Sequence, residues 1–244
     1  MELSLLFVIL FGLCIGSFLN VAIVRIPKNE SIHLPASHCP LCRHPLKWYH
    51  NVPLLSWLLL KRKCAFCHQP ISFQYPLIEL LTALIYALCY VQLHSLLQTA
   101  LVGSVFALLL ALSVIDLRYK AVPDSLSLPA LLLAFLSMRP LESFQNGLLF
   151  MGGFTLLRFS LSTLMKKEVM GEADIIIAGI IGALLGIKLG CLAIYIAAVI
   201  ALIVFMILRK KGYELAFIPF LSLGVGITWS FQIPLLHLLE HIYE

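Results

Sequence analysis

The sequence predicts an all-α polytopic membrane protein with about eight transmembrane helices and a small loop domain between the first two. The chain has 244 residues, of which 61% are hydrophobic and 12% are charged. A soluble domain has about 45–50% apolar and about 25% charged residues. The charges fall in short clusters between long apolar runs, and one polar segment is long enough to form a small domain.

Each predicted helix follows from an apolar run close to the roughly 20 residues that a membrane span needs. Two runs are short and need neighbouring residues to complete them, so seven spans is the alternative count. We expect no cleavable signal, because the first run is long enough to span and no small-residue cleavage site follows it. The runs cover approximately residues 3–24, 76–94, 97–115, 125–138, 145–164, 175–187, 190–208 and 215–231.

Lysine and arginine predict the orientation, because they are enriched in cytoplasmic loops. Basic residues gather after the first, third, fifth and seventh runs, whereas the alternate loops hold only Arg139 and Lys188. We therefore expect the N-terminus outside and the basic loops in the cytoplasm. The net charge of +5 does not indicate nucleic acid as a partner, because it is divided among short loops. Membrane lipid is the expected surrounding.

The loop between the first two runs carries the pattern of a metal site. Cys39 and Cys42 form one Cys-x-x-Cys pair, and Cys64 and Cys67 form another. Two such pairs about twenty residues apart are typical of a zinc ribbon, in which four thiolates complete a tetrahedral site. Disulfides are the alternative, and a cytoplasmic location disfavours them. We predict a zinc-ribbon-like loop domain whose structural Zn²⁺ supplies much of its folding energy.

Two aspartates stand at the ends of apolar runs. Asp116 closes the third run and Asp174 opens the sixth. A charge at the rim of a span is costly and tends to mark function, and both would lie at the cytoplasmic surface. Two neighbouring carboxylates can share a proton, so that one acts as base and the other as acid. The alternatives are an ion pair of Asp116 with Arg118 or Lys120, and an N-cap role for Asp174.

Two further acids compete with this pair. Asp124 follows a proline at the start of the fourth run. Aspartate is a good N-cap, so we interpret Asp124 mainly as a helix cap, with an auxiliary catalytic role as the alternative. Glu172 is expected to be solvated.

These residues resemble the signatures of the type IV prepilin peptidases, bifunctional enzymes of the GxGD aspartyl protease group. The resemblance covers nearly the whole chain and keeps the order of the motifs. The matching stretches are Gly16-Ser-Phe-Leu-Asn-Val21, Arg25-Ile-Pro27, Ser37-His-Cys-Pro-Leu-Cys42, Trp48-Tyr-His-Asn-Val-Pro53, Lys63-Cys-Ala-Phe-Cys67, Tyr75-Pro-Leu-Ile-Glu79, Asp116 with Val122-Pro-Asp124, and Gly171-Glu-Ala-Asp174.

Two stretches depart from the family pattern. Ala173 replaces the second glycine of GxGD, and alanine does not share the freedom of glycine at positive φ. The turn must therefore be right-handed or slightly displaced, and we expect activity to survive. The stretch Ala216-Phe-Ile-Pro219-Phe-Leu221 is similar to the family's IPFGPFL but lacks its Gly-Pro, which weakens any role assigned to it.

The resemblance implies a membrane aspartyl endopeptidase of the bacterial inner membrane. It would cleave the basic leader peptide from type IV prepilins or pseudopilins at the cytoplasmic face, with Asp116 and Asp174 as the catalytic pair. It would then N-methylate the new N-terminal residue with S-adenosylmethionine. Asn20, Arg25 and Glu79 are candidates for the methyl-donor site, with a contact to a helix N-terminus as the alternative for Glu79. No glycine-rich nucleotide fingerprint accompanies them.

The resulting organisation has four parts: a first transmembrane helix at 1–26, the four-cysteine zinc-binding loop domain at 27–75, a transmembrane aspartyl peptidase domain at 76–231, and an interfacial segment at 232–244. Three alternatives stay open. They are a peptidase without methyltransferase activity, an inactive scaffold suggested by Ala173, and a transporter with a zinc-ribbon loop. Transporters keep polar groups near the bilayer midplane, whereas the acids here lie at the rim.

Overall fold

The computed structural model describes residues 2–39, 41–137, 139–167, 170–208 and 215–243. This described part is helical, with two isolated β-bridges in the loop that follows the first helix. The chain forms two compact units, Met1–Gly103 and Ser104–Glu244. Each unit has its own helix packing.

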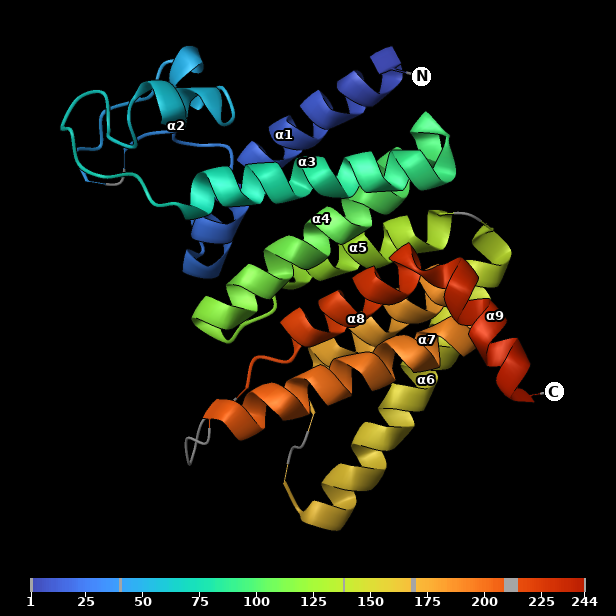
Figure 1. Ribbon diagram of the computed structural model, residues 1–244. Helices are drawn as coiled ribbons and strands as arrows, with labels where there is room; N and C mark the ends of the chain where they lie inside the picture. The colour runs from blue at the N-terminus through green and yellow to red at the C-terminus, as the bar shows by residue number, and fades with distance from the viewer. Residues whose placement is uncertain (1, 40, 138, 168–169, 209–214, 244) are drawn as a thin grey trace. The chain divides into compact units, whose positions relative to one another are not determined.

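The first unit is built on two long helices that pack along each other (Figure 1), α1 (Glu2–Arg25) and α3 (Gln74–Leu93). Gly16 allows their close approach, because a Cβ at this position would lie only 2.7 Å from Cα of Glu79. Small residues serve the same purpose at helix contacts in membranes generally. The first turns of α4 (Leu96–Tyr119) belong to this unit as well.

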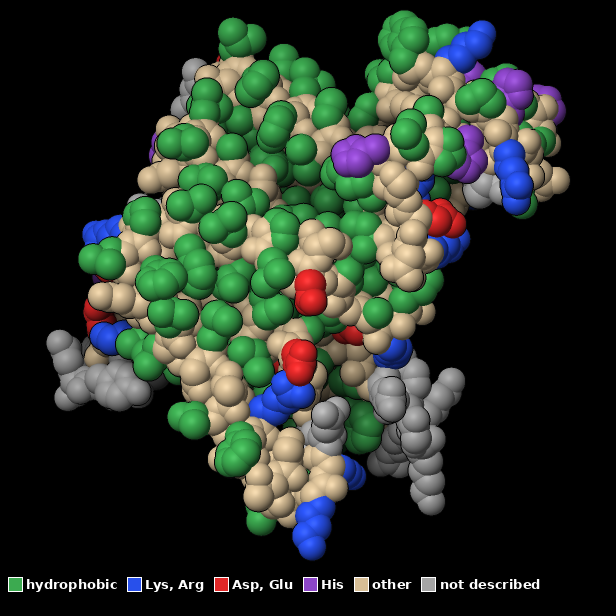
Figure 2. Space-filling model, turned by 180° about the vertical axis from the view of Figure 1, so that it is seen from behind, with side chains coloured by type: hydrophobic (Ala, Val, Ile, Leu, Met, Phe, Trp, Pro, Cys, Tyr) green, Lys and Arg blue, Asp and Glu red, His purple; other side chains and the backbone are tan. Residues whose placement is uncertain are grey.

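The loop between α1 and α3 contains only short helical pieces. These are the 3₁₀ turns η1 (Ile26–Lys28) and η2 (Trp48–Asn51), and the helix α2 (Leu55–Leu59), which packs against η2. The space-filling view in Figure 2 shows apolar side chains over the helices and basic and histidine side chains over this loop. A segment with so little regular structure needs other means to fix its shape.

In the second unit, several helices pack around one long helix, α7 (Glu172–Leu208). The remainder of α4 is followed by five helices: α5 (Asp124–Leu136), α6 (Pro140–Met165), α7, α8 (Ile218–Ser230) and α9 (Gln232–Tyr243). Helix α7 packs against α5, α6 and α8 (Figure 1). Three of its branched side chains are fully buried: Ile177, Ile180 and Ile181.

Helix α7 is interrupted at Gly186, whose φ of 69° and ψ of −171° are not helical. Such a conformation is accessible to glycine, which lacks the Cβ that would clash. The break falls within the first of two predicted apolar runs, 175–187 and 190–208. The two runs are therefore separate helical pieces that meet near this glycine.

Five helices of the described chain are long and apolar enough to cross a membrane, or six if the bent pair α8 and α9 forms one span. All eight predicted runs fall on helices. The predicted number of eight spans is reached only if α7 is divided at Gly186 and the 13-residue α5 is also counted as a span. A helix of that length reaches about 20 Å, short of the roughly 30 Å hydrocarbon core. The chain is a multi-pass membrane protein.

The contacts group α1, the loop after it and α3 in one unit. The predicted domain limits at residues 26, 75 and 231 stay predictions. The C-terminal segment from residue 232 forms α9, which bends by 82° from α8. Its interfacial position stays a prediction.

Candidate active site

Asp116 lies in the last turn of α4, with its side chain buried among residues of the second unit. Its Oδ2 accepts a hydrogen bond of 3.2 Å from the backbone N–H of Ile218, the first residue of α8. The first N–H groups of a helix have no partner within the helix. The carboxylate therefore satisfies one of them, at the end of α8 that favours negative charge.

Asp174 lies in the first turn of α7. Its Oδ2 accepts a hydrogen bond of 3.1 Å from the backbone N–H of Gly171, just before the helix. This is the return half of a capping box, in which a first-turn acid bonds the backbone ahead of the helix. Asp174 is the third residue of α7, so it is not the N-cap that the alternative proposed. The charge of Asp116 also acts on the Asp174 carboxyl, so the fold brings the two acids into electrostatic range of each other.

Ala173 fits this turn without strain. It belongs to α7, and no positive φ is found for it. The prediction of a right-handed turn at this position is confirmed. The second glycine of the family motif is not required to place Asp174, because the helix has already begun at Glu172.

Glu172 and Asp124 occupy surface positions near helix starts. The Glu172 side chain is 83% exposed and pairs with Nη1 of Arg158 at 3.2 Å, so its predicted solvated position is confirmed. The interpretation of Asp124 as an N-cap is wrong. Pro123 occupies the N-cap of α5 with an extended backbone, and Asp124 is the first helical residue.

The start of α8 contributes to the site although its sequence did not predict this role. The stretch around Ile218 lacks the family's Gly-Pro, and this reduced its expected role. The structure uses only a backbone N–H of this stretch, which any residue except proline supplies. The usable signal was Pro219, because proline is common in the first turn of a helix and a helix start is where free N–H groups gather.

The four cysteines of the loop form a compact cluster. Their Sγ atoms all lie within 4.8 Å of one another, and those of Cys39 and Cys67 are 3.9 Å apart. A tetrahedral ion with bonds of about 2.3 Å to sulfur requires sulfurs roughly 3.8 Å apart. The cluster therefore fits one tetrahedral metal ion.

The two cysteine pairs sit in backbone turns of the same design. In the first, the N–H of Cys39 bonds the carbonyl of His44, and the N–H of Arg43 bonds that of Cys39. The second pair repeats both contacts, and the equivalent bonds run from Cys64 to Gln69 and from His68 to Cys64. Arg43 and His68 both adopt positive φ. Two matched turns facing each other present four sulfurs to one point.

The two thiols of the second turn differ in pKa. The backbone N–H of Cys67 is the main cause that lowers the pKa of Cys64 to about 7. The N–H of Gln69 lowers the pKa of Cys67, but burial and the neighbouring sulfurs outweigh it and raise that pKa to about 11. Close thiols cannot all lose their protons without a cation between them, so the arrangement favours a bound metal.

Asn20, the first candidate for the methyl-donor site, is 1% exposed on α1. Its Nδ2 donates to the carbonyls of Gly16 and Tyr75, at 3.2 and 3.0 Å, and its Oδ1 accepts from Nε2 of Gln74 at 3.4 Å. Asn20 therefore joins α1 to the start of α3.

Arg25, the second candidate, closes the end of α1. Its Nη1 donates to the carbonyls of Ser31 and Pro35 at 3.0 and 2.9 Å, and its Nη2 reaches that of Ala36 at 3.5 Å. A planar guanidinium can serve several acceptors at fixed angles. Arg25 thus holds the segment that leads from α1 to the cysteines against the end of α1.

Glu79, the third candidate, is buried on α3 and contacts the loop. Its Oε2 accepts a 2.8 Å hydrogen bond from the N–H of Leu54. Leu54 has φ 60° and ψ −49°, and the N–H of Leu55 bonds the carbonyl of Pro53 at 2.6 Å. These are the features of a γ-turn with positive φ, a rare and strained form. Glu79 holds this strained turn against α3.

Comparisons with known proteins identify the family of the chain. Residues 10–93 match the bacterial peptidase A24 N-terminal domain, and residues 103–206 match the type IV leader peptidase family. A type 4 prepilin-like proteins leader peptide-processing enzyme of Escherichia coli is 34% identical, over 87% of this chain and 88% of its own. A prepilin leader peptidase/N-methyltransferase of Neisseria gonorrhoeae is 32% identical, over 90% of this chain and 87% of its own.

A prepilin leader peptidase/N-methyltransferase of Myxococcus xanthus is 37% identical over 73% of this chain, which spans 55% of that relative's length. No solved structure matches. Both parts of the chain are thus matched, and the four cysteines, Asp116 and Asp174 fall within the matched residues. The chain belongs to the type IV leader peptidase family.

Proposed function

We propose that this chain is a membrane aspartyl endopeptidase that removes the leader peptide from type IV prepilins or pseudopilins and N-methylates the new N-terminal residue. The observation that carries the proposal is the placement of Asp116 and Asp174. Each lies at the end of an apolar helix, each accepts one backbone N–H, and the charge of one acts on the other. Their position near helix ends also disfavours the transporter alternative, which needs polar groups at the midplane.

The two carboxylates perform the cleavage as a pair that holds one proton. The ionised carboxylate takes a proton from a water molecule, which attacks the scissile carbonyl carbon. The protonated partner donates to the carbonyl oxygen, and the leaving amine then receives a proton from the pair. The pair titrates as a unit, so the two roles are assigned to the pair rather than to either residue.

The backbone N–H groups of Ile218 and Gly171 hold the carboxylates in position. Each donates to Oδ2, so Oδ1 of each aspartate is the atom proposed to face water and substrate. The substrate is a prepilin, with a basic leader followed by an apolar helix. Cleavage would occur at the cytoplasmic face, as the distribution of Lys and Arg indicates. The membrane would be the bacterial inner membrane, as the family resemblance implies.

Zinc is the metal that we propose for the four-cysteine cluster. Four thiolates at tetrahedral spacing form a closed shell, which is the form of structural zinc sites. Bound there, Zn²⁺ would supply folding energy to a loop with little regular structure of its own. It would leave no open position for catalysis.

S-adenosylmethionine would supply the methyl group for the second activity. Asn20, Arg25 and Glu79 are the residues that we propose for the donor site. Their hydrogen bonds join α1, the cysteine loop and α3.

The test is prepilin cleavage in membranes by the wild type and by Asp116→Asn, Asp174→Asn and Asp124→Asn. The proposal expects loss of cleavage in the first two variants and retained cleavage in the third. Product mass, with and without S-adenosylmethionine, reads the second activity as the gain of one methyl group. A wild type that cleaves without this gain is a peptidase alone. A wild type that does not cleave favours the scaffold alternative, and loss in Asp124→Asn alone would show that the wrong aspartate was chosen.

A further inference from the structure

The helix α2 exposes an apolar face that no described part of the chain covers. Its residues Leu55, Leu58 and Leu59 follow helical spacing, so they share one side. Their exposed fractions are 58%, 62% and 79%. The neighbouring η2 adds Trp48, which is 81% exposed. Exposed large apolar residues in a contiguous group mark a contact surface.

The opposite side of α2 is fastened to the protein. The ring of Trp57 meets that of Phe73 with centroids 5.9 Å apart, and Arg62 lies over the Trp57 ring at 5.5 Å. Ser56 Oγ donates to the carbonyl of Val52 at 2.8 Å. The helix therefore has a fixed inner side, and its leucine side faces away from the loop.

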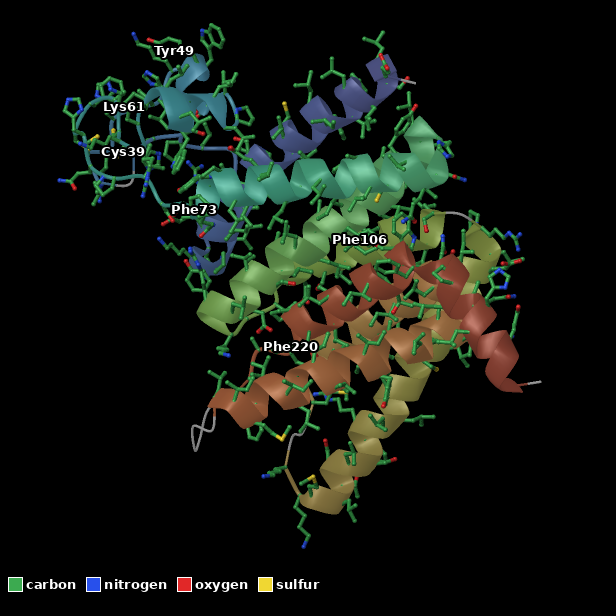
Figure 3. All side chains as sticks on the ribbon, in the orientation of Figure 1. Cys39, Tyr49, Lys61, Phe73, Phe106 and Phe220 are labelled. Atoms are coloured by element: carbon green, nitrogen blue, oxygen red, sulfur yellow. The ribbon has the colours of Figure 1, made fainter. Side chains whose placement is uncertain are left out.

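Two contacts fix the position of α2 beside the first turns of α3, and hence its depth in the membrane. Phe73 directly precedes α3, at the end of that span in Figure 3, and it contacts Trp57. Glu79, the sixth residue of α3, binds the N–H of Leu54 immediately before α2. Five residues of helix correspond to about 7.5 Å. Helix α2 is thus held beside the first turns of a membrane span, where lipid headgroups meet acyl chains.

The charge of the loop indicates that anionic lipid binds to this face. From residue 27 to residue 75 the acidic side chains are limited to Glu30. The basic ones number six: Lys28, Arg43, Lys47, Lys61, Arg62 and Lys63. Lys47, Lys61 and Lys63 flank η2 and α2 in sequence and are exposed. Apolar and aromatic side chains at interface depth with lysines beside them are typical of binding to anionic lipid.

We propose that α2 and η2 form a membrane-interface anchor. Leu55, Leu58, Leu59 and Trp48 enter the boundary between headgroups and acyl chains, and the flanking lysines contact lipid phosphates. The anchor fixes the cysteine loop against the bilayer surface. It rests on the geometry of the first unit and does not depend on the proposed peptidase activity.

The test uses the whole zinc-loaded chain in vesicles of phosphatidylcholine and phosphatidylglycerol, with bromine near the headgroup end of the acyl chains. Bromine quenches tryptophan that enters the lipid. The emission of Trp48 is obtained as the difference between the wild type and Trp48→Phe. We expect bromine to remove most of this difference. A Trp48 emission unchanged by bromine would overturn the proposal.

The matched control is a tryptophan elsewhere on the loop, Leu41→Trp in the Trp48→Phe background. Leu41 lies in the first cysteine turn and is 66% exposed, so its probe should keep its emission. Equal quenching at both positions contradicts a local anchor. A Trp48 that responds to an added prepilin peptide but not to bromine assigns the face to protein and also overturns the proposal.

Two sets of variants separate the apolar and charged contributions. Leu58→Gln with Leu59→Gln should abolish quenching of Trp48 while zinc content, the control for folding, stays unchanged. Lys47→Gln, Lys61→Gln and Lys63→Gln should each lower the equilibrium constant for insertion of the loop into the lipid surface about fivefold in vesicles with phosphatidylglycerol, as expected for a lysine at an anionic surface. The quenching of Trp48 by bromine reports this constant. The same lysine variants should have no effect in phosphatidylcholine alone. An equal effect in both vesicles would refute the role of anionic lipid.

Discussion

The N–H of Ile218 donates a hydrogen bond to Oδ2 of Asp116 across 102 residues of sequence. It joins the last turn of α4 to the first turn of α8. The carboxylate that we propose for catalysis is therefore also the acceptor for an otherwise unpaired helix N–H. Removing its charge and removing its acceptor should have different consequences.

Asp116→Asn should abolish cleavage and leave stability close to that of the wild type, because the amide carbonyl still accepts from Ile218. Asp116→Ala should abolish cleavage and also lower the free energy of unfolding, since a buried unpaired N–H costs about 1–3 kcal/mol. Thermal unfolding in one detergent compares the stability of the two variants. Equal stability of the two variants would show that the hydrogen bond contributes nothing.

Replacing one ligand of the cysteine cluster should release the metal. Cys64→Ser should reduce bound zinc and make residues 27–75 sensitive to protease, because the ion supplies much of the loop's folding energy. Cys14→Ser is the control, since Cys14 lies on α1 outside the cluster. Zinc content and digestion rate are the readouts. Full zinc content in Cys64→Ser would exclude a four-thiolate site.

The strained turn at Leu54 should depend on Glu79. Glu79→Leu removes the acceptor of the Leu54 N–H and should increase protease cleavage of the loop. Leu54→Gly should partly restore protection in that background, because glycine adopts positive φ without the strain of about 1–3 kcal/mol. The double-mutant cycle isolates the coupling. A strictly additive result would mean that Glu79 does not support the turn.

Gly16 should not tolerate a side chain. Gly16→Ala would place Cβ 2.7 Å from Cα of Glu79, so α1 and α3 must separate, at a cost of about 1–3 kcal/mol. Gly152→Ala is the matched control on α6, where a Cβ meets nothing within 4 Å. It should be neutral or gain up to about 1 kcal/mol of helix preference. Thermal unfolding compares the two, and equal loss in both would reject the close-approach argument.

Much of the architecture could be predicted from local composition. Apolar runs located α1 and the helices from α3 to α8, since a chain in lipid must satisfy its backbone hydrogen bonds internally and helices do so. The two Cys-x-x-Cys pairs predicted the metal cluster, because each pair sets its own sulfur spacing within a short turn. The rim positions of Asp116 and Asp174 were likewise visible as charges that interrupt apolar runs.

The sequence by itself determined the long apolar helices, the cysteine cluster and the two candidate acids, because each is encoded in neighbouring residues. Tertiary structure alone decided the partners of those residues. The bond from Ile218 to Asp116, the bond from Leu54 to Glu79 and the exposed side of α2 depend on residues tens of positions apart. Such contacts leave no local pattern, because a backbone N–H looks the same in every residue except proline. They arise only when the packing of whole helices brings the two groups together.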